Sequence, residues 1–187
     1  VMRKDFGAKP FIYPCPVFII ASYDENNNPD AMNAAWGCIA DYKQIALYLA
    51  SEHKTVKNIL HKKAFTVSMA DAKHVKEADY LGIVSGNKVP DKLKKANLHP
   101  IKSNLVDAPI IEEFLMTLEC KLISYDKESE LLLGEIVNVS IDESVLDENG
   151  KVDVDRLEPI TFDPVNNTYR KLGALTGQAF KDGNQIK

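Results

Sequence analysis

A short polar turn between an apolar run and a helix-like segment carries the residues best suited to bind an anion. Ser51, His53, Lys54 and Thr55 bring hydrogen-bond donors and one full positive charge to the point where a helix is expected to begin. The first N–H groups of a helix have no intrahelical partner, and the helix dipole makes that end partly positive. A phosphate group is the ligand that such a turn would bind.

An ordinary capped helix start explains the same residues. A threonine at an N-cap can bond the backbone N–H of the third helical residue, which would pair Thr55 with Asn58. Helix caps are commoner than phosphate sites, so the turn alone does not decide between the two interpretations.

The elements around this turn are mostly strands. Apolar runs rich in β-branched residues predict strands at 17–23, 32–39, 45–50, 64–69, 114–125 and 130–139. Helix-like segments lie at 56–62, 75–81 and 91–98. Many strands with few helices predict a mainly β fold, a barrel or sandwich with peripheral helices. A doubly wound sheet is not expected, because strands and helices do not alternate and no G-x-G-x-x-G motif is present.

Several pieces of the chain, in their order and spacing, resemble the flavin reductase-like, flavoredoxin-type family of FMN-binding proteins. The resemblance spans roughly residues 14–183. It rests on the pieces Asn33-Ala34-Ala35-Trp36, Ser51…Lys54-Thr55…Asn58-Ile59, Ser85–Lys88, Ala108–Glu113, Leu118–Cys120, Gly134–Val137 and Tyr169–Gly173. It implies an FMN-binding split β-barrel that works as a homodimer. We expect one domain over residues 1–187, with an arm at 1–13 and a tail at 165–187 that packs on the barrel or on the partner subunit.

The resemblance also implies roles for individual residues. Positive charge near the ring at Lys88 would stabilise the anionic reduced flavin, and Tyr169 could reach the site from the tail. Each position has a structural alternative, such as a core tryptophan, a solvated histidine or lysine, or a buried tyrosine. The cofactor-binding residues expected for FMN are Asn33, Ala34, Ala35, Trp36, Ser51, His53, Lys54, Thr55, Asn58, Lys88 and Tyr169.

Composition limits the class of protein. The chain has 187 residues and a net charge of −4, which suits one globular domain and gives no basic surface for nucleic acid. No run approaches the roughly 20 apolar residues of a membrane span, and the N-terminus does not resemble a signal peptide. The three cysteines, Cys15, Cys38 and Cys120, predict reduced, buried thiols in a cytoplasmic protein.

The function expected from the resemblance is electron transfer from NAD(P)H or a protein donor through bound FMN. The flavin ring carries the chemistry, so no catalytic side chain is expected, and histidine and cysteine spacing indicates no metal site. Two alternatives remain open at this point. One is a pure FMN electron carrier that does not use a nicotinamide. The other is a non-enzymatic module for a different phosphate-bearing cofactor or for haem.

Overall fold

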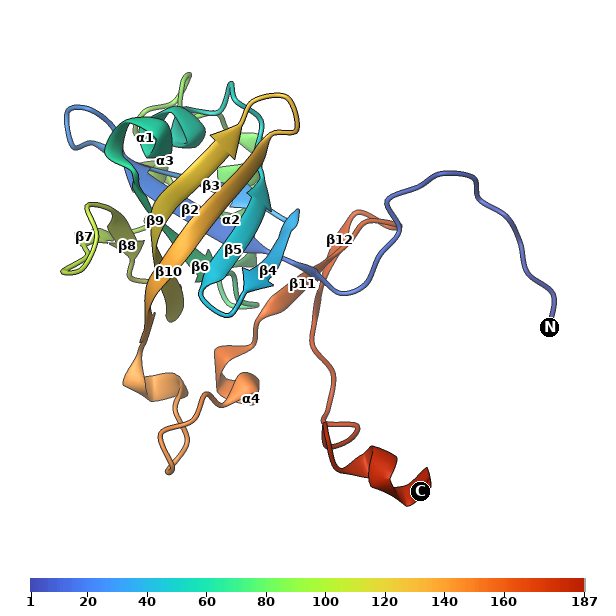
Figure 1. The fold of residues 1–187 in the computed structure, drawn as a ribbon. Helices are drawn as coiled ribbons and strands as arrows, with labels where there is room; N and C mark the ends of the chain where they lie inside the picture. Colours follow the sequence, from blue (N-terminus) through green and yellow to red (C-terminus); the bar gives the residue numbers. More distant parts are fainter. Residues whose placement is uncertain (187) are drawn as a thin grey trace.

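The computed structural model describes residues 1–186, and a curled seven-stranded antiparallel sheet forms its body (Figure 1). The strand order is β3-β2-β6-β9-β10-β5-β4. The expected mainly β fold is confirmed. The strands are β2 (Phe18–Tyr23), β3 (Pro29–Ala34), β4 (Gly37–Asp41), β5 (Gln44–Tyr48), β6 (Ala64–Met69), β9 (Met116–Asp126) and β10 (Leu131–Ile141).

A two-residue link closes this sheet into a split barrel. Strands β3 and β4 lie at opposite edges of the sheet, yet only Ala35 and Trp36 separate them in the sequence. A link of this length spans only about 10 Å, so the sheet must curl until its edges meet. The expectation of one strand over 32–39 is therefore wrong: these residues form two strands, β3 paired with β2 at one edge of the sheet and β4 paired with β5 at the other. Gly37 permits the junction, because a Cβ there would lie 2.6 Å from Leu47 Cδ2.

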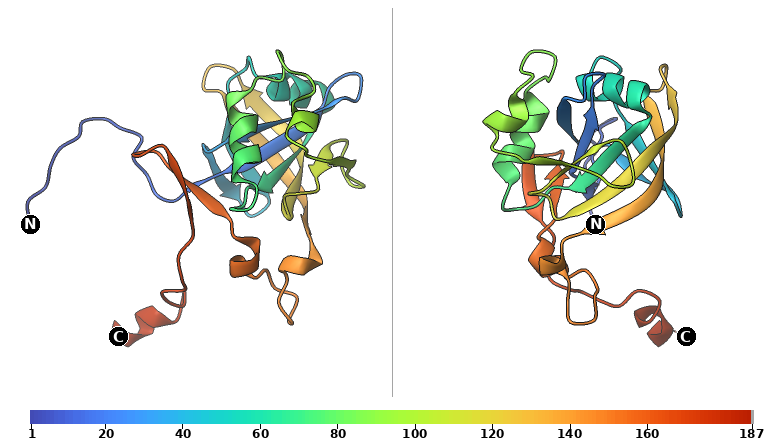
Figure 2. Two further views of the ribbon diagram at one scale, coloured as in Figure 1. Left: turned by 180° about the vertical axis from the view of Figure 1, so that it is seen from behind. Right: turned by 90° about the vertical axis from the view of Figure 1, so that its left-hand side faces the viewer.

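Both faces of β2 are buried, which explains its nearly continuous apolar sequence. Phe18 and Ile20 point into the barrel core, whereas Ile19 and Ala21 belong to a second apolar cluster on the outside of the sheet. A strand covered on both faces loses the alternation of apolar and polar residues that a half-exposed strand shows. The second cluster is covered by α2 (Val75–Ile83), which packs on this side (Figure 2).

The remaining elements are short and lie around the barrel. They are α1 (Lys54–Lys62), α3 (Lys92–Lys95), α4 (Val154–Leu157), the 3-10 helices Glu143–Val145 and Asp182–Ile186, the pair β7 (Pro100–Lys102) and β8 (Pro109–Ile111), and the small sheet of β1 (Cys15–Pro16), β11 (Ile160–Asp163) and β12 (Thr168–Lys171). The segment 91–98 forms a helix of only four residues. Among the described residues, no helix is long and apolar enough to cross a membrane.

Both ends of the chain extend away from the barrel (Figures 1 and 2). Residues 1–14 are exposed, and so are residues 172–186 beyond β12. Lys187, the last residue of the expected tail, lies outside the described residues. The expectation that the tail packs on the barrel or on a partner subunit stays a prediction.

Asp163 of β11 binds the end of the N-terminal arm to the small sheet. The side chain of Tyr13 donates a hydrogen bond to its carboxylate, which also accepts one from Asn166 Nδ2 at 2.8 Å and one from Val165 N at 3.0 Å. Arg170 Nε lies 3.3 Å from the same carboxylate. The hydrogen bonds from Asn166 and Tyr13 hold the pKa of Asp163 far below its usual value.

This arrangement makes the free energy of unfolding depend on pH in the acid range. A carboxylate with a lowered folded-state pKa stabilises the fold above its unfolded pKa, and this contribution is lost as the pH falls below about 4. We expect Asp163→Asn to flatten the acid limb of the unfolding free energy, measured by urea denaturation between about pH 7 and 2. Tyr13→Phe should move the loss to higher pH, since it removes one donor. Equal acid slopes in all three proteins would contradict this assignment.

Candidate functional site

A cavity of about 170 Å³ lies where β3, the start of α1, the end of α2 and the loop before α3 meet. Of the residues expected to bind the cofactor, it brings together Asn33, His53, Lys54 and Thr55. Two further charged residues, Asp30 and Lys92, complete its polar lining. These four residues thus line one cavity at the start of the helix, and their binding of a cofactor stays a prediction.

Helix α1 begins at Lys54, two residues earlier than expected, and Thr55 is not its N-cap. The cap position is His53, and no side chain of the described residues caps the first turn. Instead, Thr55 Oγ1 donates a 2.6 Å hydrogen bond to Asp30 Oδ2. This hydrogen bond is strong because its acceptor is charged, and charge-assisted hydrogen bonds are about twice as strong as neutral ones. The N–H groups of the first turn therefore remain available to an anion.

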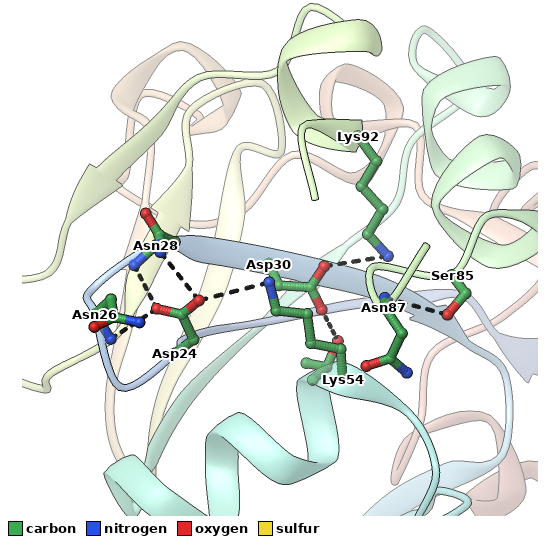
Figure 3. Close-up of polar contacts among 9 residues, drawn as sticks. Asp24, Asn26, Asn28, Asp30, Lys54, Ser85, Asn87 and Lys92 are labelled. Carbon is green, nitrogen blue, oxygen red and sulfur yellow. Dashed lines mark hydrogen bonds and ion pairs between the residues drawn. The ribbon is translucent and has the colours of Figure 1, made fainter. Parts of the chain in front are cut away.

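Asp30 is the buried centre of this site, with 2% of its surface exposed. Lys92 Nζ reaches down from α3 and lies 3.4 Å from Asp30 Oδ1 (Figure 3). The same ammonium group donates to the carbonyl oxygen of Val84 at 3.2 Å. Burial lowers the pKa of Lys92, and the charge of Asp30 opposes that shift. The carboxylate thus joins β3, α1 and α3 through one set of polar contacts.

Gly86 lets the loop before α3 lie directly on this carboxylate. A Cβ at this position would stand 2.2 Å from Asp30 Oδ1, much closer than any real contact. Gly82 is similarly placed against Asn33, where a Cβ would lie 3.2 Å from the Asn33 Cβ. The two glycines line the cavity with backbone, Gly86 from the loop and Gly82 from the end of α2. Polar backbone and little side-chain bulk suit the close approach of a phosphate group.

Lys54 lies at the outer rim of the cavity, with 18% of its side chain exposed. Its Nζ is 3.6 Å from Asp24 Oδ2, which is an ion pair but not a direct hydrogen bond (Figure 3). Asp24 itself accepts hydrogen bonds from Asn26 N and from Asn28 N and Nδ2. Burial pushes the pKa of Asp24 up, but these hydrogen bonds and the charge of Lys54 outweigh it and lower the pKa. Lys54 is therefore oriented by Asp24 while its three donors stay accessible.

The link between the two sheet edges forms a separate surface. Trp36 is 59% exposed, so its interpretation as a core residue is wrong. Ala34 and Ala35 are partly buried, and Ala35 and Trp36 line a second cavity of about 410 Å³ together with Ile12 of the arm. This apolar surface continues from Asn33, which lines the polar cavity. A ligand with one anionic end and one flat apolar end could therefore extend from one cavity onto the other surface.

Ser51 and Asn58 do not line the polar cavity. Ser51 Oγ donates to Glu52 Oε1 at 3.1 Å in the turn before α1. Asn58 is 5% exposed, and its Nδ2 is a buried donor with no hydrogen-bond partner among the described residues. An unpaired buried amide is costly, so Asn58 is a polar group with unused binding capacity near the start of α1.

Lys88 and Tyr169 lie close to the site without lining the cavity. Lys88 is exposed in the loop that follows α2. Tyr169, from β12, donates a 2.8 Å hydrogen bond to Asp79 Oδ1 on α2. Burial raises the pKa of Tyr169 to about 12, and the bond to Asp79 contributes to the shift. Their roles at a cofactor stay predictions.

Asp30 and Lys92 are not among the residues predicted from the sequence. Asp30 ends a run of turn-forming residues, Lys92 is one of several lysines in its segment, and both residue types are usually exposed. One signal was present: Lys92 lies beside Leu93 and four residues before Ala96, on the apolar side of that segment. The prediction that all three cysteines are buried is wrong for Cys38, because this residue is exposed on the edge strand β4.

Comparison with known proteins identifies the family. The family model of the flavin reductase like domain matches residues 11–164. The chain belongs to this family. The flavoredoxin of Desulfovibrio vulgaris (Miyazaki F) is 36% identical, covers 97% of this chain and 100% of its own, and superposes with a TM-score of 0.93.

Two more distant structures share the fold. A flavoredoxin from Methanosarcina acetivorans is 24% identical over 100% of both chains, with a TM-score of 0.89. An FMN-binding domain of a flavin reductases-like enzyme from Shewanella baltica OS155 is 17% identical, covers 87% of this chain and 88% of its own, and has a TM-score of 0.79. The chain spans about half the length of the curated relatives it matches, 55% and 48%.

The buried pair of Asp30 and Lys92 gives a stability prediction. Lys92→Met leaves the Asp30 carboxylate buried without its counter-charge, which should lower the unfolding free energy by about 3–5 kcal/mol in urea denaturation. Adding Asp30→Asn should recover part of that loss, because the uncompensated charge is then gone. Lys95→Met is the matched control, since Lys95 pairs with Asp91 in the open, where about 0–1 kcal/mol is expected. A loss for Lys92→Met no larger than this control would refute the pair's importance.

Proposed function

We propose that the chain binds FMN, with the phosphate in the cavity at the start of α1. The observation that carries this proposal is the helix start itself: its first turn has no side-chain cap, and Lys54 stands at its rim. Family membership supports the choice of a flavin, and the fold is shared with a domain described as FMN-binding. The donor set of N–H groups, Lys54 and Lys92 fits a phosphate.

The size of the cavity favours the phosphate end of the ligand as its occupant. At about 170 Å³ it is smaller than the roughly 300 Å³ or more that a whole cofactor needs, so it would take only the phosphate end. The isoalloxazine ring would then lie along Asn33–Trp36, where backbone amides can donate to its oxygens and nitrogens. Trp36 would border the ring from the exposed side.

The function that follows is electron transfer. Bound FMN would supply the redox chemistry, and the chain's residues would bind and orient it and set its electrostatic surroundings. We propose an oxidoreductase that takes electrons from NAD(P)H or from a protein donor. Mixing the flavin-loaded protein with NADH and following the flavin absorbance separates an NADH-dependent reductase, which bleaches, from a carrier that does not use a nicotinamide, which stays yellow.

The phosphate assignment predicts how flavins are ranked. Riboflavin lacks the phosphate and should bind at least about tenfold more weakly than FMN, since one charge-assisted contact is worth about 1.5–3 kcal/mol. Lys54→Ala should weaken FMN and leave riboflavin almost unchanged in fluorescence titrations. Lys57→Ala, on the exposed side of the same helix, is the control and should change neither. Equal affinities for FMN and riboflavin in the unaltered protein would exclude this phosphate site.

We further propose that the protein acts as a homodimer in the cytoplasm. The outer side of the barrel exposes apolar residues, among them Trp36 and Tyr48 beside the proposed ring site, Ile39 on β4, and Val137 and Val139 farther along β10. Ile12 and Pro14 of the arm line the cavity beside Trp36, but the rest of the arm and the tail, which carry further exposed apolar residues, extend away from the barrel (Figure 1). Exposed apolar surface of this kind is typical of an interface. A second subunit would also shield a flavin ring that one subunit leaves open.

The dimer can be tested in solution. Light scattering at micromolar concentration should give twice the 20.9 kDa mass of one chain. Ile39→Asp places a charge on the exposed edge strand β4 and should shift the protein toward the monomer, because a buried unpaired charge is costly at an interface. Glu135→Asp, a conservative change at an exposed position of β10, should leave the mass unchanged. A monomer mass for the unaltered protein would rule out the dimer.

A further inference from the structure

A separate cavity of about 280 Å³ lies between α4, the segment that leads into α2 and the β8–β9 turn. Helix α4 is at the end of the barrel opposite α1 (Figures 1 and 2). We call this space the α4 cavity, and the residues that determine its chemistry are Asp71, Lys73, His74, Glu112, Leu115 and Leu157. It shares no lining residue with the polar cavity or with the cavity beside Trp36, so it is distinct from the site proposed for the flavin.

Most charged side chains around the α4 cavity already have a partner. Four ion pairs account for them: Asp71–His74, Glu113–His99, Arg156–Asp153 and Glu158–Lys171. Lys73 and Glu112 form no ion pair within residues 1–186, either with each other or with a third group. Both are exposed, and they belong to different walls of the cavity. The cavity therefore presents one free cation and one free anion to a ligand.

His74 adds a fixed hydrogen-bond acceptor. Its Nδ1 lies 3.0 Å from Asp71 Oδ1, and its backbone N donates to the same oxygen at 2.8 Å. The ring also makes an edge-to-face contact with Phe114, with 5.8 Å between the ring centroids. Because a carboxylate only accepts hydrogen bonds, Nδ1 carries the proton, and in the neutral ring Nε2 is then an acceptor. Nε2 has no hydrogen-bond partner among the described residues, so it is available to a ligand.

We propose that the α4 cavity binds a free α-amino acid with an aliphatic side chain. Such a ligand carries an ammonium and a carboxylate on one carbon. Glu112 and His74 Nε2 accept hydrogen bonds from the ammonium, and Lys73 pairs with the carboxylate. Leu115 and Leu157 line the rest of the space and provide apolar surface for the side chain. The volume of about 280 Å³ is just below the roughly 300–1,000 Å³ of larger small-molecule sites, which suits a ligand of this size.

The charges exclude simpler ligands. An amine without a carboxylate leaves Lys73 unpaired, and a carboxylate without an amine leaves Glu112 unpaired. Among the described residues, no group of three histidine, cysteine or acidic side chains is placed to bind a metal ion, so the α4 cavity is not a metal site. A zwitterion is the ligand class that satisfies both free charges.

The test is isothermal titration calorimetry of L-leucine into the full chain. We expect saturable binding of one leucine per chain, with a dissociation constant of about 1 mM or lower. Isoamylamine is leucine without its carboxylate, and 4-methylpentanoate is leucine without its amine. Each should bind at least about tenfold more weakly than leucine, because each loses a charge-assisted contact.

Two variants assign the contacts. Lys73→Met and Glu112→Gln each remove one free charge at an exposed position, so both variants should fold, and each should weaken leucine about fivefold or more. Glu112→Gln should also bring leucine and 4-methylpentanoate closer in affinity, since it removes a partner of the ammonium. Lys76→Met and Glu148→Gln make the same changes at exposed positions outside the cavity and should leave leucine binding unchanged.

Three results would overturn this inference. They are no saturable binding of leucine up to about 10 mM, isoamylamine or 4-methylpentanoate binding as tightly as leucine, and equal affinities for leucine in the two cavity variants and their controls. The inference goes beyond the proposed flavin function and does not depend on it. Failure of the protein to bind FMN would overturn that function alone, because the two sites share no lining residue.

Discussion

The site depends on one buried carboxylate. Asp30 lies on an edge strand, accepts the hydroxyl of Thr55 from α1 and faces the ammonium of Lys92 from α3. Gly86 packs against the same oxygens. A buried charge must be paired and hydrogen-bonded, so these three segments can assemble in few other ways. Because His53 at the cap position makes no side-chain hydrogen bond, the first turn of α1 keeps its N–H groups for a ligand.

Closure of the barrel is the second constraint, and it determines where a flavin ring would lie. The two sheet edges are joined through Ala35 and Trp36, which leaves the tryptophan exposed and puts an apolar surface next to the polar cavity. The strand link therefore does two things at once. It makes the sheet curl, and it presents backbone and an aromatic side chain beside the polar cavity.

Lys54 connects the site to the rest of the surface. It lies between the small polar cavity and a larger cavity beside α3, and it pairs with Asp24 without a direct hydrogen bond. The proposed phosphate site therefore depends on a lysine that Asp24 orients from outside the polar cavity.

The sequence by itself determined the mainly β class, most strands and the polar character of the turn at the start of α1, because apolar runs and a polar turn before a helix are local signals. Family resemblance added the flavin. Only the tertiary structure revealed Asp30 and Lys92, because a buried ion pair joins residues 62 positions apart and each looks like an ordinary surface residue in the sequence. The same holds for the break at Ala35 and Trp36 and for the exposure of Trp36 and Cys38. These depend on which edge each strand joins, and strand pairing is decided by packing across the whole sheet rather than by neighbours in the chain.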